Sequence, residues 1–263
     1  MLITLVVANQ KGGVGKTTTA LNLAASLSAA SRKVLLIDLD AQGNSTTGTG
    51  EEKNQKETSL IDVLVDNDSA LEKVIEETRY KFDLIPASTD LISAEIELSS
   101  LPSPTAILKE KLKDLGEAYD YTVIDCPPSL GMLSVSALRA ASKVLIPLQC
   151  EYYSLEGLAS MNKTINEIND ATGEKIEISG ILRTMYDSRI RLSREVSQEL
   201  EEHFSEQLCD TVIPRNVKLA EAPSFGMPAL YYDPEAKGTL AYLALAGEII
   251  NKYETNSASL IND

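Results

Sequence analysis

The stretch NQKGGVGKTTTA, residues 9–20, constrains the fold more than any other part of the chain. An apolar, β-branched run precedes it at Leu2–Ala8, and a segment of helical period follows it at Thr17–Ala29. The usual phosphate-loop pattern is G-x-x-x-x-G-K-[ST] between a strand and a helix, and residues 15–17 match its end. Gln10 occupies the position of the first glycine, so the loop is a variant of that pattern. The order strand, glycine loop, helix predicts a phosphate site in an α/β protein.

The residue types in this loop are those that phosphate binding requires. Glycines at positions 12, 13 and 15 let the backbone take positive φ and approach oxygen atoms closely. The helix that starts near Lys16 directs its positive end at the β-phosphate. Lys16 would neutralise the β- and γ-phosphates of ATP, and the Thr17 hydroxyl would ligate Mg²⁺. A glycine-rich turn without a ligand is the alternative, but it does not explain lysine and threonine at both required positions.

A second lysine, Lys11, stands five residues before Lys16. Lys16 alone is enough to hold a nucleotide, so Lys11 needs its own explanation. A solvated surface lysine is the ordinary interpretation of a lysine in a loop, and the loop by itself leaves that alternative open.

Short apolar runs alternate with longer helical segments along the whole chain. The runs are Leu2–Ala8, Val34–Asp38, Phe82–Pro86, Tyr121–Asp125, 143–149, 178–184 and 210–214. Strands that are apolar on both faces and separated by helices indicate a mainly parallel sheet covered on both sides. With right-handed crossovers, this pattern predicts a doubly wound α/β fold with helices on both faces. We expect a single domain over residues 1–255 and a frayed tail over 256–263.

Aspartates end two of these predicted strands. Asp38 and Asp40 close VLLIDLD, and Asp125 closes YTVID. Carboxylates at the carboxyl ends of parallel strands lie where this architecture binds its ligands. Each aspartate alone has a simpler interpretation as a helix cap or a loop residue, but three of them behind a phosphate loop support a ligand site at this edge.

Composition excludes several other chemistries. The formal net charge of -15 argues against binding of polyanions by the whole surface, so any nucleic-acid contact needs a local or dimer-built basic patch. The three cysteines lie far apart and form neither a C-x-x-C pair nor a zinc spacing, and we expect all of them to be reduced: Cys126, Cys150 and Cys209. His203 is the only histidine, which leaves serine–histidine or histidine–metal mechanisms almost without support.

The N-terminus has too short an apolar run, and no leading positive charge, for a signal peptide. No apolar stretch approaches the roughly 20 residues that span a bilayer. We therefore expect a cytoplasmic protein without a stable membrane anchor.

Five motifs together resemble a known family. KGGVGKTT, DLDAQGN and IDCPPSLG are similar to the deviant Walker-motif ATPases typified by ParA, Soj and MinD. PLQCEYYSLEGL and VIPRNVKLAEAPSFGMP narrow the resemblance to the short ParA/Soj branch, the DNA-partitioning ATPases. The resemblance runs from about residue 2 to residue 250, with the motifs in family order. It implies a P-loop NTPase of the deviant Walker type that hydrolyses ATP slowly, as a switch.

The resemblance also gives Lys11 a role. In such ATPases two subunits sandwich two nucleotides, and the extra lysine reaches the partner's phosphates, much as an arginine finger does. ATP binding would therefore form a homodimer. Asp40 matches the family aspartate that orients the attacking water, and Asp38 and Asp125 match the acidic residues around Mg²⁺. Ala41 stands where many relatives have proline, and we expect no functional consequence.

The site residues implied in this way fall into three sets. The catalytic set is Lys11, Lys16 and Asp40. The metal set is Thr17, Asp38 and Asp125. The nucleotide-binding set adds the loop next to the adenine and comprises Lys11, Gly12, Gly13, Val14, Gly15, Lys16, Thr17, Thr18, Pro214 and Asn216.

The predicted DNA surface rests on the same resemblance. Relatives bind double-stranded DNA without sequence preference through basic residues of their C-terminal part, and Arg189 and Lys218 match these positions. Lysine at 218 keeps the charge of the more frequent arginine but loses its fork geometry. The alternative is a solvated helix face on which arginines pair with glutamates: Arg189, Arg191, Arg194, Glu195 and Glu199.

Three functions follow from these patterns. The first is a DNA-partitioning ATPase whose DNA-bound dimer is released when a ParB-like centromere-binding protein stimulates hydrolysis. The second is a MinD-like, membrane-associated ATPase that positions a division site or a protein cargo. EIINKYETNSASLIND has one lysine and an acidic end, so it lacks the basic amphipathic helix which that function requires. The third is a metabolic or iron–sulfur relative, which the cysteine spacing and VIPRNVKLAEAP disfavour.

Overall fold

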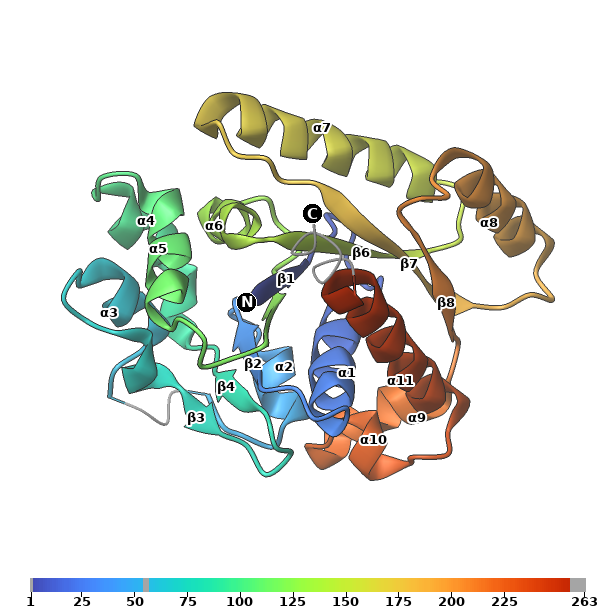
Figure 1. Ribbon diagram of the computed structural model, residues 1–263, viewed down its shortest axis with the longest axis horizontal. Helices are drawn as coiled ribbons and strands as arrows, with labels where there is room; N and C mark the ends of the chain where they lie inside the picture. The colour runs from blue at the N-terminus through green and yellow to red at the C-terminus, as the bar shows by residue number, and fades with distance from the viewer. Residues whose placement is uncertain (1, 54–56, 256–263) are drawn as a thin grey trace.

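The computed structural model describes residues 2–53 and 57–255, so the predicted tail over 256–263 lies outside the described residues (Figure 1). The strands are β1 Ile3–Val7, β2 Val34–Asp38, β3 Glu76–Glu77, β4 Asp83–Ile85, β5 Tyr121–Asp125, β6 Lys143–Gln149, β7 Ile178–Tyr186 and β8 Leu208–Pro214. The α-helices are α1 Lys16–Ala29, α2 Asn44–Gly48, α3 Leu60–Val65, α4 Ala94–Ser99, α5 Ile107–Asp114, α6 Met132–Ala140, α7 Ser154–Thr172, α8 Arg191–His203, α9 Val217–Glu221, α10 Ala229–Tyr232 and α11 Lys237–Ile250. Short helical turns complete the described chain at Leu71–Val74, Thr89–Ile92, Pro104–Ala106, Ala222–Phe225 and Asn251–Thr255.

The strands form one sheet in the order β3-β4-β2-β5-β1-β6-β7-β8. All neighbouring strands are parallel except β3, which pairs antiparallel with β4. The predicted fold class is therefore confirmed, and each of the seven predicted strands is present within two or three residues of its predicted bounds. Strand β3 was not predicted, because an edge strand of two glutamates carries no apolar pattern.

Apolar side chains cover both faces of the sheet. One core cluster joins alternate strand residues to α1 and α11, and includes Leu5, Leu23 and Leu245. The other joins the remaining strand residues to α3 through α8, and includes Ile37, Leu138 and Met161. Figure 1 shows this division, with α1 and α11 side by side below the sheet and α7 and α8 on its other side. The continuous apolar strands predicted from the sequence follow from this double burial.

The central strands create the crevice where a ligand fits. Strands β1 and β5 are neighbours, but the helices that follow them pack on opposite faces: α1 in one core cluster and α6 in the other. In open α/β sheets the ligand binds at such a point, outside the carboxyl ends of the strands. The glycine loop after β1 and Asp125 at the end of β5 both lie there.

Candidate active site

The glycine loop joins β1 directly to the first turn of α1. Gly13 and Gly15 have φ of 73° and 90°, which favour glycine, and an added Cβ at Gly13 would meet no atom within 4 Å. Gly15 is the N-cap of α1 and supplies no side-chain cap to its first amides. These amides are unpaired at a helix N-terminus, so they form an anion-binding edge.

Lys16 begins α1 and folds back over the loop. Its side chain is buried, and Nζ donates a hydrogen bond to the Lys11 carbonyl oxygen at 3.0 Å. Burial lowers the pKa of Lys16, and the negative charge of Asp125 opposes this shift. A partly desolvated ammonium next to helix amides is well suited to hold a multiply charged anion.

Lys11 has a different environment although it belongs to the same loop. Its ammonium points outward and forms an ion pair with Glu151 at 2.6 Å, with 41% and 51% of the two side chains exposed. An exposed pair of this kind contributes at most about 1 kcal/mol, so Lys11 can exchange its partner at little cost. This role of Glu151 was not predicted from the sequence, although the residue belongs to the PLQCEYYSLEGL motif.

Asp38 and Asp125 meet at the carboxyl ends of neighbouring strands. They are register partners in the parallel β2–β5 pair, and both are fully buried. Asp38 Oδ2 accepts hydrogen bonds from the Thr46 N–H and hydroxyl, each at 2.8 Å. Asp125 Oδ2 accepts a hydrogen bond from the Ser45 hydroxyl at 2.8 Å. The short helix α2 therefore orients both carboxylates, a role of Ser45 and Thr46 that no sequence motif had indicated.

This carboxylate pair fits a divalent cation. Asp125 Oδ1 is buried and finds no hydrogen-bond partner among the described residues. Burial and the adjacent Asp38 charge raise the pKa of Asp125 to about 8, while burial raises the pKa of Asp38. Thr17 lies beside Asp125, where it lowers the pKa of that carboxyl. Two desolvated acids with an unpartnered oxygen and a nearby hydroxyl are the donor set that Mg²⁺ prefers.

Asp40 lies two residues beyond β2, on the rim of this site. Its N–H donates to Asp38 Oδ1 at 3.2 Å, and its own Oδ1 accepts the Gln42 N–H at 3.0 Å. Together with Pro127 and Pro128 it lines a cavity of about 530 Å³. Asp40 is thus held rigidly while its side chain borders a space large enough for water and a second molecule.

The predicted adenine loop closes the other side of the glycine loop. Pro214 ends β8, and Asn216 caps α9 by accepting the Lys218 N–H at 2.8 Å. Both line a mainly apolar cavity of about 300 Å³ that also includes Gly15 and Thr18. The fold therefore brings these four predicted nucleotide residues into one cavity, which suits a flat aromatic base.

Arg189 lies in the loop between β7 and α8, and Lys218 lies in the first turn of α9. Arg189 precedes α8 and pairs with Asp187 at 2.7 Å, and Lys218 pairs with Glu221 at 2.9 Å. The alternative of a helix face paired with glutamates holds for Arg191, which pairs with Glu195 at 2.7 Å, but not for Arg189.

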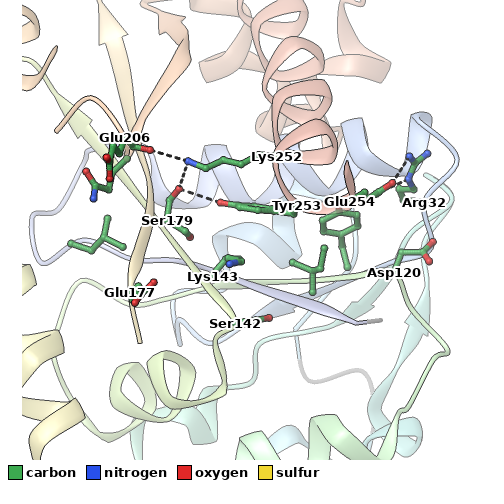
Figure 2. Close-up of a pocket in the computed structure, with 14 residues that line it drawn as sticks. Arg32, Asp120, Ser142, Lys143, Glu177, Ser179, Glu206, Lys252, Tyr253 and Glu254 are labelled. Carbon is green, nitrogen blue, oxygen red and sulfur yellow. Dashed lines mark hydrogen bonds and ion pairs between the residues drawn. The ribbon is translucent and has the colours of Figure 1, made fainter. Parts of the chain in front are cut away.

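A cavity of about 700 Å³ lies at the opposite edge of the sheet. Figure 2 shows that residues near the C-terminal end of the described chain line this cavity. Arg32 donates to both oxygens of Glu254, and Lys252 donates to the Ser179 and Glu206 carbonyls. None of the predicted site residues lies there, so cavity size does not mark the active site.

Two further observations concern chemistry outside this site. Cys126 and Cys150 follow β5 and β6 directly, and all three cysteines are free, as predicted, and buried. Among residues 2–53 and 57–255, no helix combines the length and hydropathy needed to cross a bilayer.

Comparisons with known proteins agree with this geometry. A family model described as an AAA domain matches residues 3–178. The chromosome partitioning protein ParA of Caulobacter vibrioides (strain NA1000 / CB15N) is 45% identical over 260 residues, which cover 97% of this chain and 96% of the relative. The sporulation initiation inhibitor protein Soj of Bacillus subtilis (strain 168) is 45% identical over 245 residues, covering 93% and 97%. Cobyrinic acid a,c-diamide synthase from Mycobacterium smegmatis, in a crystal structure with bound ADP and magnesium, has a TM-score of 0.84 at 33% identity, covering 97% of each chain.

A glycine loop after the central strand, with buried aspartates at the neighbouring strand ends, defines a P-loop NTPase. Within this class, the second lysine of the loop and the sequence identity to ParA and Soj indicate one family. The chain belongs to the ParA/Soj family of chromosome-partitioning ATPases. The metabolic alternative receives less support, because the synthase is less similar in sequence than either partitioning relative.

Proposed function

We propose that this chain is an ATP-dependent DNA-partitioning ATPase that moves a chromosome or plasmid. ATP closes a homodimer, and the dimer binds double-stranded DNA without sequence preference. A ParB-like centromere-binding protein stimulates ATP hydrolysis, and hydrolysis releases the dimer from DNA. The observation that carries the proposal is the contrast between two lysines of one loop: Lys16 is buried against the site, and Lys11 projects outward. The working location would be the cytoplasm, on the nucleoid.

Each side chain of the site has a role in this proposal. ATP with Mg²⁺ supplies a terminal phosphoryl group that can be transferred to water. Lys16 and the first amides of α1 hold the phosphates, with the glycine loop, Gly12 to Gly15, wrapped around them, and Thr18, Pro214 and Asn216 enclose the nucleoside. Thr17, Asp38 and Asp125 hold the metal. Asp40 orients water and accepts its proton, because it is the rigidly held carboxylate that borders the open cavity.

Lys11 links ATP to dimerisation. In the single chain its ammonium is paired with Glu151. In the sandwich it exchanges this carboxylate for the partner's phosphates, which carry more charge and are less exposed to solvent. The γ-phosphate side of each site is thus complete only in the dimer, so ATP in the site becomes a condition for assembly.

DNA binding by the purified protein tests the proposal. We expect binding of a labelled duplex of arbitrary sequence with ATP, little binding with ADP or without nucleotide, and weaker binding as salt rises. Arg189→Glu should lose this binding while retaining ATP hydrolysis, because Arg189 lies outside the nucleotide site. Absence of DNA binding under all conditions, with hydrolysis intact, would reject the DNA-based function and direct attention to anionic lipid vesicles and protein cargo.

The metal site gives a pH-dependent prediction. The pKa of Asp125 is raised to about 8 from an ordinary value of 3.8, so the folded state binds more protons than the unfolded state between these values. Stability without metal should therefore fall as pH rises through this window. Asp125→Asn removes the cost of burying an ionised carboxylate. A gain of about 1–2 kcal/mol in the free energy of unfolding would raise Tm by roughly 2–8 °C.

Differential scanning calorimetry in EDTA measures this effect. The gain in Tm should be larger at pH 8 than at pH 5, and Mg²⁺ with ATP should stabilise the wild type but not Asp125→Asn. Asp120→Asn is the matched control, since it alters an exposed carboxylate at the other edge of the sheet. An equal gain from both variants would show that net charge, rather than the buried pair, determines the result.

A further inference from the structure

Arg189, the predicted DNA contact, is neutralised by a carboxylate of its own loop. Asp187 follows β7 and accepts three hydrogen bonds from Arg189. The N–H and Nε donate to Oδ1 at 3.0 and 2.9 Å, and Nη2 donates to Oδ2 at 2.7 Å. The Arg189 side chain is 88% exposed, whereas that of Asp187 is only 18% exposed. The Arg189 guanidinium therefore faces solvent, while its Nε and Nη2 donors are both hydrogen-bonded to Asp187.

Arg215 lies on the other side of the same carboxylate. It follows β8, and its N–H donates to the Tyr186 carbonyl at 3.3 Å, which fixes it next to the Asp187 loop. Hydrogen bonds from Arg189 lower the pKa of Asp187 to about 2, and the positive charge of Arg215 adds to this shift. Within the described part of the chain, the exposed Arg215 side chain has no ion pair and no hydrogen bond.

We propose that Asp187 competes with DNA phosphate for the Arg189 guanidinium, and that Arg215 is an additional phosphate contact at the same place. The inference rests on the proposed DNA-binding function and adds to it the residues that set the affinity. Phosphate and carboxylate use the same bidentate geometry toward arginine, so one can replace the other on Arg189. An ion pair at the surface holds its partner weakly, so the exchange is easy.

The positive charge of Arg215 makes it easier for phosphate to replace Asp187 on Arg189. When phosphate takes Arg189, Asp187 loses this partner, and Arg215 remains beside it to compensate its charge. Arg189, Asp187 and Arg215 together carry one positive charge, whereas the two arginines alone would carry two. A surface of this kind binds DNA weakly as a single copy, and its affinity rises when dimerisation places two copies on one duplex.

Fluorescence anisotropy with a labelled duplex and the full chain in a non-hydrolysable ATP analogue tests this inference. Asp187→Asn keeps the shape of the side chain but removes the charge, so DNA affinity should rise roughly two- to fivefold per subunit. Glu195→Gln is the matched control, because it removes an equal charge next to Arg191 on the same surface. Asp187→Asn should gain less in the Arg189→Gln background than in the wild type, because only its effect on Arg215 then remains.

Arg215→Gln should weaken DNA binding several-fold. Because Arg215 also lines the adenine cavity, the affinity for the ATP analogue is measured in parallel, and the loss of DNA affinity should exceed any loss of nucleotide affinity. A loss of nucleotide affinity equal to the loss of DNA affinity would make Arg215 a nucleotide residue and overturn its assignment. A gain in Asp187→Asn no larger than in Glu195→Gln would overturn the competition at Arg189. If the wild type binds DNA but neither the Asp187→Asn gain nor the Arg215→Gln loss is seen, only this inference is wrong. If the wild type does not bind DNA, the proposed function is wrong as well.

Discussion

Lys16→Ala is expected to remove most ATP binding, because it deletes the buried ammonium that we place against the phosphates. Lys16 is the buried lysine of the loop, and Asp125 lies close enough to affect its charge. Loss of one partner from a desolvated charge pair costs about 3 kcal/mol or more, which weakens binding roughly a hundredfold or more. Isothermal titration calorimetry with ATP and Mg²⁺ measures the loss directly.

Lys11→Ala is the matched variant for this experiment. It makes the same chemical change in the same loop, yet it removes only an exposed ion pair to Glu151. We expect it to retain nucleotide binding within several-fold of the wild type, but to remain monomeric with ATP in size-exclusion chromatography with light scattering. Equal loss of ATP affinity in both variants would show that Lys11 serves its own subunit and would contradict the sandwich.

Asp40→Ala is expected to block hydrolysis while leaving ATP bound, and therefore to accumulate the dimer. A carboxylate that positions water and accepts its proton contributes about 10²- to 10⁴-fold to such a reaction. Phosphate release under single-turnover conditions should slow by this factor. The dimer should persist with ATP for as long as the nucleotide is intact.

Asp40→Asn distinguishes a catalytic role of the Asp40 carboxylate from a role in holding the loop in shape. The asparagine can still accept the Gln42 N–H, so the loop geometry is preserved while the base is removed. Both variants should behave alike if Asp40 acts on water. A monomeric Asp40→Ala protein under saturating ATP, or full activity in Asp40→Asn, would count against this role.

Much of the fold was predictable because it depends on local patterns. The strands are continuous β-branched runs, and the glycine loop needs only its own residues to adopt positive φ at Gly13 and Gly15. The positions of Asp38 and Asp125 also followed, because the ends of parallel strands share one edge. The edge strand Glu76–Glu77 could not be predicted, since its pairing depends on β4 and not on its own side chains.

The partners of the site residues were harder to predict than the site itself. Ser45 and Thr46 lie in a short helix without a motif, and only the tertiary fold brings them to the two aspartates. Glu151 lies 140 residues from Lys11. Asp187 and Arg189 are close in sequence, but a bidentate pair requires a loop conformation that spacing does not specify. Sequence motifs thus predicted the groups that we propose to act on ligands, and the structure was needed to find the groups that restrain them.

The packing of α1 against α11 has a consequence for how the protein is made. Thr19 of α1 shares a buried hydrogen bond of 3.1 Å with Tyr242 of α11, across 223 residues of sequence. The helix that begins at the nucleotide loop therefore lacks its covering partner until Lys237–Ile250 has left the ribosome. Contacts between distant residues form late and slowly. The nascent chain can assemble the face covered by α3 through α8 first, and α1 gains its cover only after α11 has emerged.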